Sequence, residues 1–319
     1  MSGLNSLLDN LRRTYAAIGE VQEVAARMPG DIMVLANLGS LKREATDLEA
    51  LWEEECRQAR VEVCRYRLMP ENDERYTVAA VTKSLLDFQE LFSQIYDALK
   101  NGVKKSRQLS SWMLNETAFD FGFSYPGSLG VALMVPSHAD LLGGKFDDTV
   151  DAFLQVMHVS NEDEVKDLAK SLGPAVVKKA YDWSRVNHSS GYAVDVTWNT
   201  VQGTKKGAVV DVAALGKIVE IIGRTSDVER QNIRGPGILV GLDTLKKRFR
   251  FVEPDGLDYS GPVTEEFEIQ RKWAVNQTYI AHIQVEEITE YATQEIKRTY
   301  RLVSLTPVGT QPDKVSDRT

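Results

Sequence analysis

Apolar residues recur every three or four positions through most of the first hundred residues, the spacing that places them on one face of a helix. Two such stretches flank Pro29-Gly30, and a third runs from about Thr77 to Leu99. Because Pro and Gly end helices and Asp31 can cap the next one, the first two stretches predict an antiparallel helical hairpin. We expect residues 1–110 to form a helical bundle of three helices, interrupted by an extended segment from Arg60 to Met69.

The second predicted helix carries a seam in which steps of four and three residues alternate. Such a seam packs either against a helix of the same chain or against a second copy of the chain, and the pattern leaves both possibilities open. The residues that would carry self-association are Leu38, Leu41, Leu48 and Trp52.

Residues 111–227 show the alternation of apolar and polar positions that is typical of strands, interspersed with helical stretches. Phe119 to Ser124 and Leu129 to Val135 predict a β-hairpin, and Tyr192 to Trp198 predicts a further strand. Gly173-Pro174 separates two predicted helices, and Asp211 is expected to cap another. This order predicts an antiparallel sheet with helices on one face.

Residues 228–305 predict a small five-stranded barrel. The expected elements are strands at 233–242, 246–252 and 259–263, a helix at 264–273, and strands at 279–288 and 297–305. A helix between the third and fourth strands resembles the order of elements in oligonucleotide/oligosaccharide-binding (OB) barrels. Residues 225–231 are expected to be a linker and residues 306–319 a loose tail. The fold class that follows is α+β in three parts.

The strand expected at 246–252 has two different sides. Lys246, Arg248 and Arg250 fall on one side, and Phe249 and Phe251 fall on the other. The basic side is a candidate for contact with nucleic-acid phosphates. Outward Lys and Arg on a small barrel also serve solubility and protect strand edges, so the pattern leaves both interpretations open.

The composition describes an acidic globular chain. Its 319 residues carry a formal net charge of −8, which disfavours non-specific attraction to nucleic acid or anionic lipid. Cys56 and Cys64 match no metal-binding or redox spacing and are expected to be reduced thiols. The chain begins without the pattern of a secretory signal and has no apolar run of bilayer-spanning length, so we expect a cytoplasmic protein that is not in a membrane.

Few residues suggest catalysis. The four histidines form no metal-binding pair, and the segment Leu142 to Phe146 lacks the spacing of a phosphate-binding loop. Asp255, Glu295 and Lys297 match the loose pattern of metal-dependent nucleases, although Pro254-Asp255-Gly256 indicates a tight turn. We therefore expect no cofactor and no bound metal.

Three functional hypotheses follow from these patterns. The first is a non-enzymatic cytoplasmic scaffold or sensor that acts through self-association or a protein partner. The second is a nucleic-acid-binding protein that uses the basic strand of the C-terminal barrel. The third is a metal-dependent nuclease.

Overall fold

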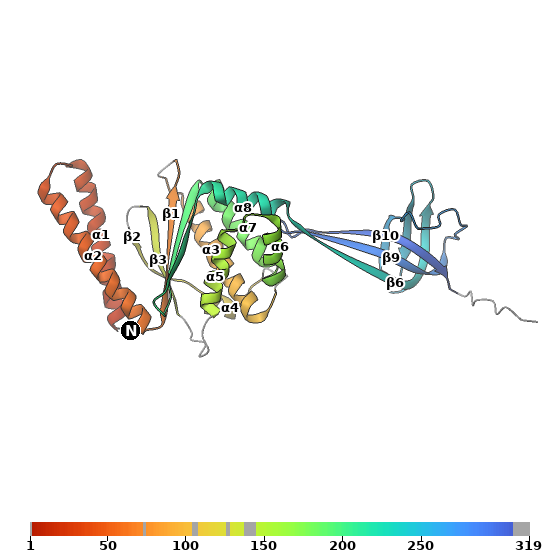
Figure 1. Ribbon diagram of the computed structural model, residues 1–319, viewed down its shortest axis with the longest axis horizontal. Coiled ribbons are helices and arrows are strands. Elements are labelled where there is room, and N and C mark those ends of the chain that lie inside the picture. The colour runs from red at the N-terminus through yellow and green to blue at the C-terminus, as the bar shows by residue number, and fades with distance from the viewer. Residues whose placement is uncertain (1, 73–74, 104–107, 126–127, 137–144, 309–319) are drawn as a thin grey trace, which may run out of the picture. The chain divides into compact units, whose positions relative to one another are not determined.

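A computed structural model describes residues 2–72, 75–103, 108–125, 128–136 and 145–308 (Figure 1). The chain divides into two compact units, and each is described by itself. The first unit comprises Met1–Thr225 together with Tyr291–Thr293, and the second comprises Ser226–Glu290 and Gln294–Thr319. Residues on both sides of the boundary expected at residue 110 thus lie in one unit.

The first unit is built on a five-stranded antiparallel sheet with the order β2-β3-β1-β4-β5. β1 (Val61–Pro70) lies at its centre and pairs with β3 (Leu129–Pro136) on one side and β4 (Tyr192–Asn199) on the other. β2 (Asp120–Tyr125) and β5 (Lys205–Val210) are the edge strands. The segment expected only to be extended at 60–69 is therefore the strand that organises the sheet.

One face of this sheet is covered by a group of helices that enclose the largest core. They are α3 (Val78–Asn101), α5 (Lys145–Met157), α6 (Glu162–Ser171), α7 (Pro174–Ser189) and α8 (Val212–Arg224), with the short α4 (Ser111–Glu116) beside them (Figure 1). From β1, Cys64, Tyr66 and Leu68 point into this core, as the alternation of side chains along a strand requires. The predicted break at Gly173-Pro174 is confirmed, with Pro174 opening α7.

The opposite face of the sheet is covered by a hairpin of two long helices, α1 (Ser2–Arg27) and α2 (Ile32–Gln58) (Figure 1). The predicted cap is confirmed, because the Asp31 side chain accepts hydrogen bonds from the backbone N–H groups of Met33 and Val34. A second, smaller core joins the base of the hairpin to the sheet. It contains Leu8, Leu11, Trp52, Cys56, Val63, Phe123 and Ala132.

Two expectations about these helices are wrong. Helices cover both faces of the sheet, not one, because β1 presents Val63 to the hairpin and Cys64 to the larger core. For the same reason α3 does not form a bundle with α1 and α2, since it packs in the core on the other side of the sheet. β1 pairs with strands that lie far along the chain, and the resulting sheet separates α3 from the α1–α2 hairpin.

A buried chain of hydrogen bonds links β1 to α3 and α7 inside the larger core. The Trp183 indole N–H donates to the Tyr66 hydroxyl at 3.0 Å, and the Ser84 hydroxyl lies 2.7 Å from both Tyr66 Oη and Asn187 Oδ1. The Asn187 amide then donates to the Trp183 carbonyl at 2.8 Å. The side chains of these four residues therefore all have hydrogen-bond partners within the protein. The network fixes the two helices in one register on the sheet.

The second unit is a curled five-stranded antiparallel half-barrel with the order β10-β9-β6-β7-β8. Its strands are β6 (Ser226–Asp243), β7 (Arg248–Val252), β8 (Asp258–Pro262), β9 (Gln277–Glu290) and β10 (Ile296–Pro307). Its core includes Leu239, Phe249, Phe251, Ile283 and Leu302. The five expected strands are present, and an isolated parallel bridge joins Val263 to Leu302.

Three local expectations about the C-terminal region are wrong. Residues 264–273 form irregular turns instead of a helix, and Phe267 is buried and stacks on Trp273. Residues 226–231 are strand instead of linker, because their backbone groups pair with 285–290 while their polar side chains stay exposed. In the expected tail, Thr306 and Pro307 end β10, and residues 309–319 lie outside the described residues.

Replacing Tyr66 by Phe is expected to lower the free energy of unfolding by about 1–3 kcal/mol, because the Trp183 N–H loses its acceptor inside the core. Urea denaturation measures the change. Tyr181→Phe is the matched control, since the Tyr181 hydroxyl makes no hydrogen bond within the described part of the chain. Equal stability of the Tyr66 variant and the wild type would show that the buried network contributes little.

Candidate functional site

The base of the α1–α2 hairpin is held on the sheet by aromatic and charged contacts. The Trp52 ring meets the edge of Phe123 with centroids 5.1 Å apart, and Tyr15 stacks on the same ring at 5.4 Å. Arg65 of β1 donates to Glu49 at 3.0 Å and to Glu53 at 2.6 Å. These contacts make the hairpin a fixed part of the first unit and not a loosely tethered arm.

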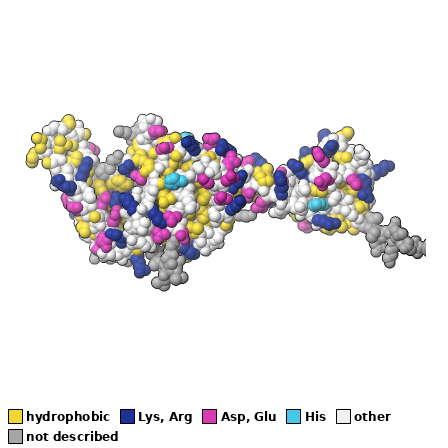
Figure 2. Space-filling model, viewed as in Figure 1, with side chains coloured by type: hydrophobic (Ala, Val, Ile, Leu, Met, Phe, Trp, Pro, Cys, Tyr) yellow, Lys and Arg dark blue, Asp and Glu magenta, His cyan; other side chains and the backbone are white. Residues whose placement is uncertain are grey.

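The turn end of the hairpin is different, because its large apolar side chains are exposed. Ile32 and Met33 are 80% and 79% exposed. The same end carries three more exposed apolar residues, Val24, Met28 and Leu35. Figure 2 shows a hydrophobic patch at this end of the hairpin. We call these five residues the tip patch. The tip patch was not predicted from the sequence, although Ile32, Met33 and Leu35 lie off the apolar seam of their helix.

The residues proposed from the seam for self-association occupy two environments. Leu38 and Leu41 are half-buried in the distal half of α2. Leu48 packs against the smaller core, and Trp52 is completely buried in it. At the end with Leu48 and Trp52, the seam therefore packs against residues of the same chain. Its role in self-association stays a prediction.

The alternation expected for the basic strand is present from Arg248 onward, whereas Lys246, which was expected on the strand, precedes it. Arg248 and Arg250 are exposed on β7, Phe249 and Phe251 are buried, and Lys246 lies exposed in the preceding turn. Arg250 makes an ion pair with Asp258 of β8, in which Nε and Nη2 lie 3.0 Å and 2.7 Å from the same carboxylate oxygen, Oδ2. The hydrogen bond from Arg250 lowers the pKa of Asp258. Part of the basic charge is therefore balanced within the strand pair.

Asp255 and Lys297, two of the three residues of the nuclease pattern, make local contacts. The Asp255 carboxylate accepts a hydrogen bond from the Leu257 N–H in the turn between β7 and β8. Lys297 donates to Glu290 of the neighbouring strand, and Glu295 precedes β10. Across the described ranges, no three His, Cys, Asp or Glu side chains are arranged to hold a metal ion. The segment Leu142 to Phe146 falls mostly outside the described residues.

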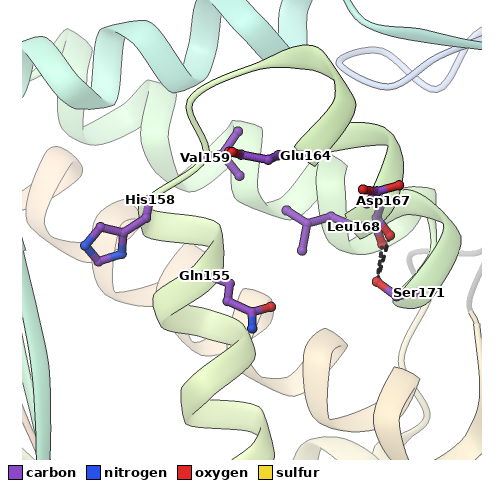
Figure 3. A pocket seen from close by; sticks show the side chains of 7 residues that line it. All are labelled: Gln155, His158, Val159, Glu164, Asp167, Leu168 and Ser171. Carbon is purple, nitrogen blue, oxygen red and sulfur yellow. Dashed lines mark hydrogen bonds between the residues drawn. The ribbon is translucent and has the colours of Figure 1, made fainter.

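A pocket of about 430 Å³ lies between the end of α5 and α6 (Figure 3). Its polar groups make local helix contacts: Ser171 donates to the Asp167 carbonyl at 2.8 Å, and Glu164 accepts from the Ser160 N–H at 2.8 Å. Figure 3 shows the His158 ring directed away from Asp167 and Ser171. The pocket therefore lacks a paired acid and base of the kind that general catalysis uses.

A buried carboxyl group lies on the face of the sheet that α5 covers. Glu62 of β1 is 2% exposed, and its carboxylate accepts a hydrogen bond from the Trp198 indole N–H at 2.5 Å. Burial raises the pKa of Glu62 to about 7, against an ordinary 4.5. Nearby, Lys206 pairs with Asp151 at 2.7 Å and Asp147 at 3.7 Å. The sequence signal for this group is an acid within the otherwise largely apolar run Val61–Cys64.

Among the described residues, no helix is apolar enough along its length to cross a membrane. The chain matches no protein-family model, and no curated protein and no solved structure shows significant similarity to it. The chemistry of its own residues is therefore the basis for any functional proposal.

The raised pKa of Glu62 makes stability depend on pH. Because the folded protein holds the proton more tightly than the unfolded chain, the free energy of unfolding is expected to fall as the pH rises from about 4.5 to about 7, by on the order of 3 kcal/mol. Glu62→Gln should remove this decline and be more stable than the wild type at pH 8. Denaturation at a series of pH values measures both, with the exposed Glu44→Gln as control. Parallel profiles of Glu62→Gln and wild type would contradict the assignment.

Proposed function

We propose that the protein is a non-enzymatic binding protein that self-associates through the distal half of its α1–α2 hairpin. The observation that carries this proposal is the tip patch, five exposed apolar side chains on a hairpin whose base is fixed to the sheet. Exposed apolar patches of this kind mark protein interaction sites. A second copy of the chain is the proposed occupant.

A pair of helices buries only one stripe of each helix, whereas four helices enclose a complete core. Two hairpins packed together would cover the tip patches of both chains. The five side chains are between 39% and 80% exposed, so covering them in both copies is equivalent to burying about six whole side chains. At about 1.5–3 kcal/mol for each, the gain is about 9–18 kcal/mol, which is comparable to an association cost of about 4–15 kcal/mol.

The charges of the hairpin also suit a second copy. Glu20 on α1 and Lys42 and Arg43 on α2 are exposed, and none of them forms a salt bridge within the described part of the chain. A surface with unpaired charges of both signs can complement itself across a two-fold axis. These residues lie on the same hairpin as the tip patch.

Nucleic-acid binding through β7 is a second candidate. It is supported by the exposure of Arg248 opposite the buried Phe249. We also propose that the second unit is an OB-like barrel. The strand order, with β6 between β7 and β9, and the parallel bridge from Val263 to Leu302 support this. In such barrels the second and third strands form the usual binding face.

We further propose a cytoplasmic location, supported by the two free, buried thiols of Cys56 and Cys64.

The self-association proposal predicts a dimer at micromolar concentrations, measured by sedimentation equilibrium. Ile32→Ser combined with Met33→Ser should give a monomer with unchanged circular dichroism, because both side chains are exposed and removing them does not disturb a core. The control is Val78→Ser combined with Leu245→Ser, which removes side chains that are 83% and 95% exposed elsewhere. A monomeric wild type, or a tip variant that still dimerises, would overturn the proposal.

The nucleic-acid proposal predicts that single-stranded DNA or RNA binds at low salt and dissociates as salt rises, because phosphate contacts release counterions. Changing Lys246, Arg248 and Arg250 to Glu should abolish that binding in a fluorescence anisotropy titration. The control is Arg271→Glu with Lys272→Glu, which reverses basic charges elsewhere in the same unit. An absence of binding by the wild type at low salt would remove this candidate.

A further inference from the structure

The outward face of β6, β9 and β10 carries an unbroken block of polar side chains. Cross-strand pairing aligns them in three rows. The rows are Arg230, Glu286 and Thr299; Asn232, Gln284 and Arg301; and Arg234, His282 and Ser304. Because side chains alternate along a strand, the neighbouring residues Ile233, Ile283 and Leu302 point to the other face and join the core. Nine polar side chains from three strands thus share one surface.

Part of this surface is hollowed into a groove of about 460 Å³. Five members of the first two rows line the groove, together with the neighbouring residues Gln231 and Val285. The five are Arg230 and Asn232 from β6, Gln284 and Glu286 from β9, and Arg301 from β10. A volume of this order matches the pockets that hold small molecules. A ligand in the groove would therefore meet side chains from all three strands at once.

The groove is rich in hydrogen-bond donors and poor in acids. Its one carboxylate, Glu286, already accepts a hydrogen bond from Arg230 Nε at 2.9 Å, and Arg230 Nη2 lies 2.9 Å from the same oxygen. Arg301 forms no salt bridge with any residue that the structure describes, so its guanidinium is available to a ligand. The Asn232 Oδ1 atom accepts a hydrogen bond from His282 Nε2 at 3.3 Å, and Asn232 lies opposite Gln284 in the strand pair. The site is thus cationic within a chain of net charge −8.

A polar outer face is normal for an antiparallel sheet, but its usual residues are mixed Lys and Glu that serve solubility. Here the central row consists of two carboxamides and an unpaired Arg, side chains with directed donors that suit recognition of a specific group. A register shift between Leu302 and Ser304 places Ser304 opposite His282 at the edge of the same surface. Such bulges re-aim side chains and are over-represented beside functional sites.

We propose that this groove binds the phosphate group of a small phosphorylated molecule. The Arg301 guanidinium matches phosphate oxygens with two parallel N–H donors, and the amides of Asn232 and Gln284 supply further neutral donors beside it. Arg234, one row away, adds a second cation that also lacks a salt bridge in the described residues. Arg230 is a positioning residue that pairs with Glu286 and balances the charge of this carboxylate. This site is separate from the hairpin and does not depend on self-association.

Isothermal titration calorimetry of the full chain at low salt tests the proposal, with AMP, glucose 6-phosphate, inorganic phosphate and the phosphate-free adenosine as separate probes. At least one phosphorylated probe is expected to bind in a saturable manner, and adenosine is not. The ranking of AMP, glucose 6-phosphate and inorganic phosphate then shows whether the natural ligand presents a nucleoside, a sugar or the phosphate group alone.

Arg301→Gln should weaken binding of the phosphorylated probe about tenfold or more, because a charge-assisted hydrogen bond to phosphate is lost. Arg298→Gln is the matched control, since it makes the same charge change on the same strand. Its side chain lies on the opposite face, paired with Glu287 at 2.6 Å. Binding to Arg298→Gln should stay within about twofold of the wild type. Circular dichroism verifies that both variants are folded.

Three results would overturn the proposal. One is that no phosphorylated probe binds the wild type at millimolar concentration, including the case in which only a single-stranded oligonucleotide binds. Another is that adenosine binds as tightly as AMP. The third is an equal loss of binding in Arg301→Gln and Arg298→Gln, which would show general charge attraction instead of a site on this face.

Discussion

β1 presents apolar side chains to both faces of its sheet, and a strand of this kind is stable only when both faces are covered. Val63 contacts the core beneath the hairpin, while Cys64, Tyr66 and Leu68 contact the core beneath α3 and α7. Every layer of the first unit follows from this requirement. The hairpin lies on one side and the remaining helices on the other, because an uncovered face would leave aromatic and aliphatic side chains in contact with water.

The two covers of the sheet are fixed by different means. On the side of α3 and α7, a closed chain of hydrogen bonds through Tyr66, Ser84 and Asn187 sets the helix positions within a large apolar core. On the hairpin side, the core is small, and Arg65 adds ion pairs to two carboxylates of α2. The hairpin is long enough that only its base takes part in these contacts. Its distal half is therefore free for another role, and its exposed apolar end is the feature on which the proposed self-association rests.

The sheet of the second unit has an apolar inner face and a polar outer face. Its interior is filled by alternate residues of the five strands, and the exterior carries the basic residues of β7 and the polar rows of β6, β9 and β10. On β7, Arg250 is balanced by Asp258, whereas Arg301 on β10 has no such partner among the described residues. This difference makes the groove on β6, β9 and β10 the stronger candidate for an anion site. The hairpin and the groove belong to different units, so the proposed self-association and the proposed phosphate binding do not compete for the same residues.

Local patterns in the sequence determined most of the elements themselves. The hairpin with its cap at Asp31, the break at Gly173-Pro174 and the two-sided strand Arg248–Val252 all depend on neighbouring residues, whose spacing and backbone preferences are visible in the chain. Pairing between distant segments was decided only in the tertiary structure. The central position of β1, the strand at 226–231 and the irregular turns at 264–273 depend on partners dozens to more than a hundred residues away, which override local propensity. The tip patch and the polar groove likewise emerge only when packing shows which apolar residues stay exposed and which polar residues share a face.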